Sequence, residues 1–168
     1  RCASYEDNGT EWRTHHIANP VIGDRSFGAD PATVTDYAGA YARGLRDGGV
    51  TPVLKHFPGH GSVTTDTHLD LAVQRRTLRQ LRRLDLHPFQ QAIDRGVPAV
   101  MTGHIDVRAV APGVPATLSR RVTTGLLRRQ MGFDGLVVTD SLGMGAITRR
   151  ARSGDAAVRA LRAGADVV

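Results

Sequence analysis

Short apolar runs that alternate with amphipathic segments constrain the fold of this chain more than any other sequence feature. The apolar runs lie at 50–54, 97–102 and 136–138, and 166–168 resembles a fourth strand that stops early. The segments with apolar residues at helical spacing lie at 30–48, 77–96, 119–132 and 154–164. Buried strands that alternate with helices are typical of βα units around a parallel sheet. The sequence therefore predicts an α/β fold, and 168 residues are enough for one sizeable core.

Capping residues, prolines and glycines predict where the helices begin and end. A side-chain cap with a proline in the first turn opens a helix, and glycine commonly closes one. The boundary residues are Asp30, Pro31, Gly48 and Gly49 for the first helix, Thr77, Pro88 (a break or restart) and Gly96 for the second, and Ser119 and Gly132 for the third. The residues expected to face the core are Val34, Tyr37, Ala38, Tyr41 and Leu45 in the first helix, and Ala157, Leu161 and Ala165 in the last.

Polar residues follow each predicted strand. Lys55 and His56 follow the first strand, His104 and Asp106 the second, and Asp140 the third. Because the carboxyl ends of parallel strands meet at one edge of a sheet, these side chains are expected to gather there. For Asp140 an equally good interpretation is that it, or the serine after it, caps the next helix.

Asp66 and His68 lie two residues apart in the loop after the first strand. In an extended loop they face the same side, which favours a hydrogen bond between carboxylate and imidazole. Such a pair makes a proton shuttle that works near neutral pH. A solvated loop histidine without a role is the alternative.

A metal site is the other chemistry these histidines allow. His56, His60, Asp66 and His68 could form a histidine–carboxylate site, but the loop contains flexible glycines and the spacing matches no zinc motif. The pair at 15–16 is expected in a surface loop, and the single Cys2 excludes an internal disulfide and a cysteine-based zinc site. We therefore predict no metal and no cofactor.

The basic composition invites a nucleic-acid interpretation that the pattern does not favour. The net charge is +6 and the pI about 10.6, yet the arginines are spread over several segments and aromatic residues make up 5%. We expect no nucleic-acid partner. No apolar run reaches the length of a membrane span, and no signal peptide is visible, which leaves the compartment open. Arg25 lies in a short loop between Gly23 and Gly28, a weak signal by itself.

Several motifs together resemble one family. Residues 55–61 (KHFPGHG) and 66–68 (DTH) resemble the signature of bacterial β-N-acetylhexosaminidases of glycoside hydrolase family 3. Residues 19–28, 101–105, 115–119 and 135–147 resemble that family's upstream loop, middle segments and nucleophile strand. The motifs occur in the family's order.

The resemblance implies a (β/α)8 TIM-type barrel and a retaining glycosidase that acts on terminal β-linked N-acetylglucosamine, as in peptidoglycan fragments. The carbohydrate would be the partner, and phosphate could replace water as acceptor. By the same resemblance, Asp140 matches the nucleophile, His68 the acid/base and Asp66 its partner. Arg25, Lys55 and His56 match residues that hold the sugar hydroxyls.

The chain departs from the family in extent. Eight βα units need about 250 residues, so a partial barrel of about five units is expected. Residues 1–18 are expected to be a divergent lead segment, and 19–168 the partial barrel domain. The open edges of such a barrel favour self-association. An inactive, truncated sugar-binding fragment is the alternative to an active enzyme.

Overall fold

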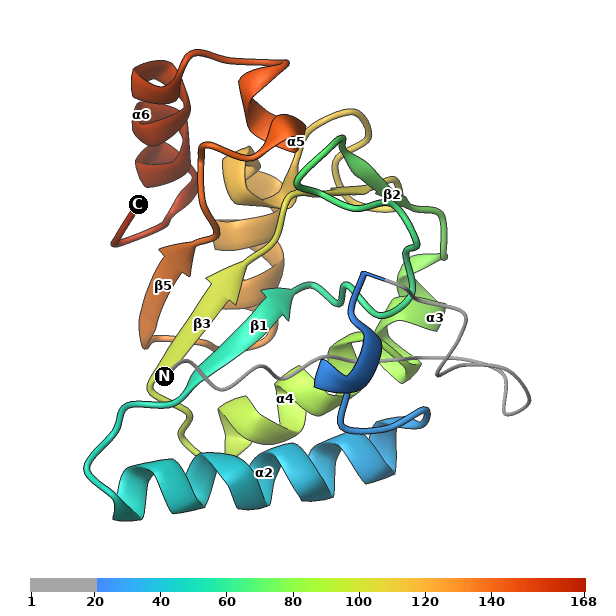
Figure 1. Ribbon diagram of the computed structural model, residues 1–168, viewed down its shortest axis with the longest axis vertical. Helices are drawn as coiled ribbons and strands as arrows, with labels where there is room; N and C mark the ends of the chain where they lie inside the picture. Colours follow the sequence, from blue (N-terminus) through green and yellow to red (C-terminus); the bar gives the residue numbers. More distant parts are fainter. Residues whose placement is uncertain (1–20) are drawn as a thin grey trace.

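The computed structural model describes residues 21–168, which form a parallel sheet with helices packed around it (Figure 1). The main sheet has the order β1-β3-β5. Its strands are β1 (Val53–Phe57), β3 (Ala99–Thr102) and β5 (Leu136–Thr139). Val167 adds a parallel bridge to Val138 of β5. The expected α/β pattern is confirmed, and the strands follow one another in chain order, as successive βα units do.

The pairing register aligns the carboxyl ends of the strands. Thr102 of β3 pairs with Thr139 of β5, and Phe57 of β1 pairs with Thr102. The β1–β3 register shifts between Leu54 and Phe57. The residues that follow each strand therefore come together at one edge.

The first strand lies further along the chain than the predicted 50–54. Val50 and Thr51 are exposed, and the Val50 N–H donates to Leu45 O at 2.8 Å, so Val50 still belongs to the end of the preceding helix. Pro52 has no N–H to give to a sheet. Lys55 and His56 consequently lie within β1 and not after it.

A second, two-stranded parallel sheet was not predicted. It pairs β2 (Ala72–Gln74) with β4 (Ile105–Val107). His104 and Asp106 were expected only as polar residues after the second strand, but the residues of β4 are all buried. The strand forms because β2, at the end of the long loop after β1, supplies its hydrogen-bonding partner.

Helix α2 (Pro31–Asp47) has the predicted ends, but it buries fewer residues than its apolar spacing predicted. The Asp30 carboxylate accepts from the N–H groups of Ala32 and Thr33, and Gly48 forms the C-cap. The expectation that Tyr37 and Tyr41 face the core is wrong, since they are 65% and 46% exposed. The residues that α2 buries are Val34, Thr35 and Ala38. A short 3₁₀ turn, η1 (Gly23–Arg25), precedes α2.

The predicted second helix is divided before Pro88. Thr77 forms a capping box with Gln80 at the start of α3 (Leu78–Arg83), and α4 (Leu86–Asp94) follows after Leu84 and Asp85. Pro88 lies in the first turn of α4, where no intrahelical N–H is required.

The remaining helices complete the layer around the sheet. They are η2 (Ala116–Leu118), η3 (Arg121–Gln130, with π spacing), α5 (Gly145–Thr148) and α6 (Ser153–Ala163). The expected face of α6 is wrong at Leu161, which is 49% exposed. The face of α6 against η2 and η3 consists of the small residues Ala156, Ala160 and Ala163, which allow close approach.

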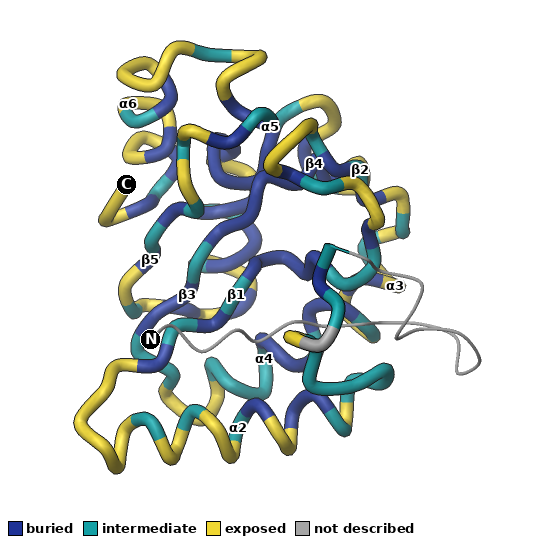
Figure 2. Tube along the Cα trace, viewed as in Figure 1, coloured by how far each residue is buried: buried dark blue, intermediate teal, exposed yellow. Residues whose placement is uncertain are grey.

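The core lies between the sheet and these helices, and the Phe57 and Phe89 rings meet edge to face there at 5.3 Å. Figure 2 shows the buried strands at the centre and the exposed outer turns of α2 and α6. Within residues 21–168, no helix has the length and apolar character of a membrane span. The expected lead segment 1–18 and the histidine pair at 15–16 fall outside the described residues.

Candidate active site

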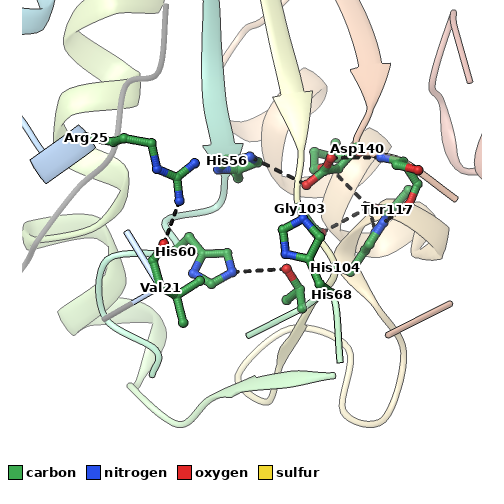
Figure 3. A network of polar contacts seen from close by, with 12 residues as sticks. Val21, Arg25, His56, His60, His68, Gly103, His104, Thr117 and Asp140 are labelled. Atoms are coloured by element: carbon green, nitrogen blue, oxygen red, sulfur yellow. Dashed lines mark hydrogen bonds and ion pairs between the residues drawn. The ribbon is translucent and has the colours of Figure 1, made fainter. Parts of the chain in front are cut away.

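A cavity of about 130 Å³ opens at the carboxyl ends of β1 and β5 (Figure 3). All predicted site residues except Asp66 line this cavity, and Asp66 is hydrogen-bonded to His68, which lines it. The lining residues are Val21, Ile22, Arg25, Lys55, His56, His60, Thr67, His68, Asp140 and Met144. The structure thus brings together residues from η1, β1, the loop after β1 and the end of β5.

Asp140 follows β5 directly and is held by the backbone. Its N–H donates to Thr102 O at 3.0 Å, and its Oδ1 accepts from the Ser141 N–H at 2.8 Å. Its Oδ2 lies 3.5 Å from His56 Nε2. Asp140 does not cap the next helix, since Met144 occupies the N-cap of α5 without a side-chain cap bond. The capping interpretation is therefore wrong for Asp140.

A glycine that directly follows the neighbouring strand β3 leaves room for His56 beside it. A Cβ on Gly103 would lie 3.0 Å from His56 Cβ. The Gly103 N–H also donates to Phe57 O at 2.8 Å. The neighbouring Lys55 lines the same cavity although successive strand residues normally face opposite sides. The shifted register between β1 and β3 is the kind of irregularity that redirects a side chain toward a site.

His68 and Asp66 form the predicted pair, in a turn and not in an extended loop. His68 Nδ1 lies 2.7 Å from Asp66 Oδ1, and the His68 N–H donates to the same oxygen at 2.9 Å. The backbone closes the turn, because the N–H groups of Leu69 and Asp70 both donate to Asp66 O. The hydrogen bonds from the His68 backbone and ring hold the pKa of Asp66 below its ordinary value. With Nδ1 bound to the carboxylate, Nε2 is the ring atom left to exchange protons.

The loop that carries His68 is fixed at its base by a buried ionic network. Asp85 is fully buried and accepts from Arg76 Nη1 at 2.7 Å and from the Ser62 hydroxyl, and Arg76 also donates to Ser62. Burial raises the pKa of Asp85, and Arg76 and Ser62 oppose that rise. Gly59 packs against Asp85 with φ +116°, in a position where a Cβ would lie 2.8 Å from Asp85 Cβ. The sequence offered one signal for Asp85, an acidic residue between two apolar ones.

Three further contacts hold the tip of the loop. His60 Nε2 lies 3.2 Å from Thr67 Oγ1. The N–H groups at the start of α5 donate to the loop backbone, Gly145 to His68 O at 2.8 Å and Ala146 to Thr67 O at 3.2 Å. The segment after Asp140 therefore supports the loop that presents His68.

Arg25 forms the wall contributed by the segment before α2. Its guanidinium donates to Val21 O at 2.6 Å and to Ile22 O at 3.2 Å. These bonds tie the side chain to two apolar residues that also line the cavity.

Two residues expected at this edge do not line the cavity. His104 is fully buried, with Nδ1 near Thr117 Oγ1 and Nε2 near Ser141 O, both at 2.9 Å. Asp106 lies in β4, pairs with Arg108 at 3.0 Å and accepts from the Gly113 N–H. The reason is the small sheet, which turns the chain away from the cavity after β3.

In the part of the chain that the structure describes, no three His, Cys, Asp or Glu side chains are arranged to hold a metal ion. The metal alternative built on His56, His60, Asp66 and His68 gains no support from these positions. The pairs actually formed are His56 with Asp140, and His68 with Asp66.

Comparison with known proteins identifies one family. The family described as "Glycosyl hydrolase family 3 N terminal domain" matches residues 14–168. The chain is 49% identical over 153 residues to the beta-hexosaminidase LpqI of Mycobacterium tuberculosis. The aligned region covers 88% of this chain and 39% of LpqI. The chain therefore spans about two fifths of the length of this curated relative.

Solved structures agree with this match. A glycoside hydrolase family 3 beta-N-acetylglucosaminidase from Paenibacillus sp. has a TM-score of 0.91 at 44% identity, over 98% of this chain and 30% of that protein. NagZ from Neisseria gonorrhoeae, solved with N-trifluoroacetyl-D-glucosamine, has a TM-score of 0.82 at 36% identity. The match covers 98% of this chain and 44% of NagZ. The family resemblance of the sequence motifs and the partial α/β barrel are both confirmed.

Proposed function

Because the chain belongs to the N-terminal domain family of glycosyl hydrolase family 3, we propose that its cavity hydrolyses terminal β-linked N-acetylglucosamine. The names of its relatives support this substrate, since they are called beta-hexosaminidase and beta-N-acetylglucosaminidase. One relative was solved with an N-acylated glucosamine. Peptidoglycan fragments carry this sugar and are our proposed natural source.

The observation that carries the proposal is that Asp140 and His68, far apart in the chain, line one cavity. Retention requires a nucleophile and a group that first gives and then takes a proton. The Asp140 carboxylate attacks the anomeric carbon while His68 Nε2–H protonates the leaving oxygen, which gives a covalent glycosyl-enzyme. In the second step, neutral His68 takes a proton from water, and the water oxygen displaces Asp140.

Asp66 prepares His68 for both steps. The bond between Asp66 Oδ1 and His68 Nδ1 fixes the ring tautomer and stabilises the imidazolium. The exposed side chain of His68, at 71%, leaves it room to approach the glycosidic oxygen and to withdraw.

The remaining polar residues of the cavity bind the sugar. Arg25 from η1 and Lys55 and His56 from β1 offer donors to the cavity that Asp140 also lines. Charge-assisted bonds from such groups orient hydroxyls more strongly than neutral ones do.

Phosphate is a second acceptor that the charges of the cavity favour. A neutral histidine in the acid/base position does not repel an anion, whereas a carboxylate would. Arg25 and Lys55 add positive charge to the same wall.

The test is turnover of a chromogenic β-N-acetylglucosaminide by the 168-residue chain. We expect Asp140→Asn to lower kcat by at least about 10³-fold, because the nucleophile is lost. The matched control is Asp134→Asn, an exposed carboxylate just before β5, which should keep normal turnover. Nuclear magnetic resonance of the first-formed product should show the β anomer, and added phosphate should yield a sugar phosphate if phosphorolysis operates.

Unchanged turnover in Asp140→Asn would refute the assignment of the nucleophile. A folded chain without any turnover would instead favour the inactive sugar-binding fragment.

A further inference from the structure

His104 joins three segments behind the cavity. The ring is fully buried beyond the end of β3, between Thr117 of η2 and the carbonyl of Ser141. Figure 3 places it beside Thr117 and the segment that begins at Asp140. It does not line the cavity, so contact with a bound sugar does not explain a histidine here.

The contacts of His104 select one protonation state. Ser141 O can only accept, so a proton on Nε2 donates to it at 2.9 Å. Nδ1 lies 2.9 Å from Thr117 Oγ1, whose hydroxyl also donates to Gly103 O at 3.0 Å. The other neutral tautomer would set the Nε2 lone pair against the Ser141 carbonyl. A doubly protonated ring is disfavoured, because burial lowers the pKa of His104.

The Ser141 carbonyl belongs to the turn that aims the Asp140 carboxylate. The Asp140 N–H is bound by Thr102 O, and the Ser141 N–H is bound by Asp140 Oδ1. The Ser141 carbonyl accepts from the His104 ring at 2.9 Å and from the Met144 N–H of the same turn at 3.2 Å. Of these two bonds, the one from His104 ties the turn to the segment that follows β3. A rotation of this residue would break its N–H bond to Oδ1 and release the carboxylate.

We infer that His104 is a positioning residue, whose Nε2–H holds Ser141 and thereby keeps the Asp140 carboxylate aimed into the cavity. The catalytic consequence rests on the proposed function, whereas the hydrogen-bond geometry does not. Thr117 Oγ1 contacts Nδ1 at 2.9 Å and holds the other side of the ring.

Two amide variants separate the roles of the ring nitrogens. In His104→Gln the side-chain N–H₂ can reach the position of Nε2 and donate to Ser141 O. In His104→Asn the amide is one bond shorter and corresponds to Nδ1, so Ser141 O loses the donor from residue 104 and keeps only the Met144 N–H. Both replace the ring by a neutral amide, which makes each the control for the other.

The first readout is hydrogen exchange of the Ser141 amide, which needs no turnover. We expect exchange about tenfold faster in His104→Asn and close to wild type in His104→Gln, because the two variants differ by the one hydrogen bond to Ser141 O.

The second readout is kinetic. His104→Asn should lose about 10²-fold in kcat with KM within about threefold, because a displacement near 1 Å has this effect. His104→Gln should stay within about fivefold of wild type. Circular dichroism checks that each variant is folded.

Equal impairment of the two variants would overturn the inference, as would wild-type exchange and kcat in His104→Asn. If His104→Asn does not fold, Thr117→Val takes its place. That change removes the contact between Nδ1 and Thr117 Oγ1 that holds the ring against Ser141 O, so it should speed Ser141 exchange, and unaltered exchange would count against the inference. A chain without turnover whose Ser141 exchange follows the expected order would contradict the proposed function and still support the positioning role.

Discussion

Single residues in this protein take their chemical state from a few short contacts. Asp66 shows this most directly, because both its main hydrogen bonds come from His68. The backbone N–H contributes most to the low pKa of Asp66, and the ring follows. The folded pKa lies below that of the unfolded chain. The contacts therefore stabilise the loop fully above about pH 3.8 and are lost as the pH falls through the lowered pKa.

This arrangement predicts the titration of Asp66. In carbon-13 resonance titrations, the Asp66 carboxyl should have a midpoint below 3.8. His68→Ala should raise that midpoint only part of the way, because the N–H of residue 68 still donates. A midpoint at or above 3.8 in the wild-type chain would show that the pair is not formed. His87→Ala, on α4, is the control and should leave the Asp66 midpoint unchanged.

At the scale of elements, the contact between α5 and the loop around His68 couples the two halves of the site. Gly145 makes this contact possible, because a Cβ there would lie 2.4 Å from Leu69 O and 2.7 Å from His68 O. Backbone atoms cannot move aside as the end of a flexible side chain can. The short α5 therefore sets the distance between the end of β5 and the loop.

Gly145→Ala should separate these elements. We expect a loss of about 1–3 kcal/mol in the free energy of unfolding from the overpacking, and a kcat at least about tenfold lower because His68 is displaced. Thermal unfolding and turnover measure the two effects. Gly154→Ala in α6 is the matched control, since nothing lies within 4 Å of its Cβ, and it should be neutral or slightly stabilising. Equal free energies of unfolding for Gly145→Ala and Gly154→Ala would contradict the close packing of Gly145 against the loop.

For the whole molecule, the open side of the sheet is the feature with the clearest consequence. Five large exposed apolar side chains lie on β5, on α6 and at the two residues 167–168. They are Leu136, Val158, Leu161, Val167 and Val168. A strand edge with apolar neighbours favours pairing with another chain. The expected self-association through an open barrel edge therefore remains our prediction.

Sedimentation velocity tests it. The 168-residue chain should form dimers whose dissociation constant rises about tenfold or more in Val167→Lys and Leu161→Lys, since a charge would be buried at the interface. Tyr37→Lys, on the exposed side of α2, should leave association unchanged. A chain that stays monomeric at its highest soluble concentration would exclude this edge as an interface.

Much of the fold was readable from the sequence because its signals are local. Asp30 and Pro31 start α2, and the apolar runs at 97–102 and 136–138 contain β3 and β5. The outcome for Leu161 differs, because small alanines on another face of α6 pack closer to η2 and η3 than leucine could. Periodicity cannot choose between two such faces without knowing the neighbouring element.

The sequence by itself determined which residue types stand after each strand, the family they indicate and the pairing of Asp66 with His68, since these depend on spacing within a segment. Only the tertiary structure decided that His56 faces Asp140, that Asp106 turns away into a second sheet and that His104 supports Ser141 from behind. Those contacts join segments far apart in the chain. They are fixed by strand register and by the approach of backbone to backbone at Gly103 and Gly145, neither of which a local pattern encodes.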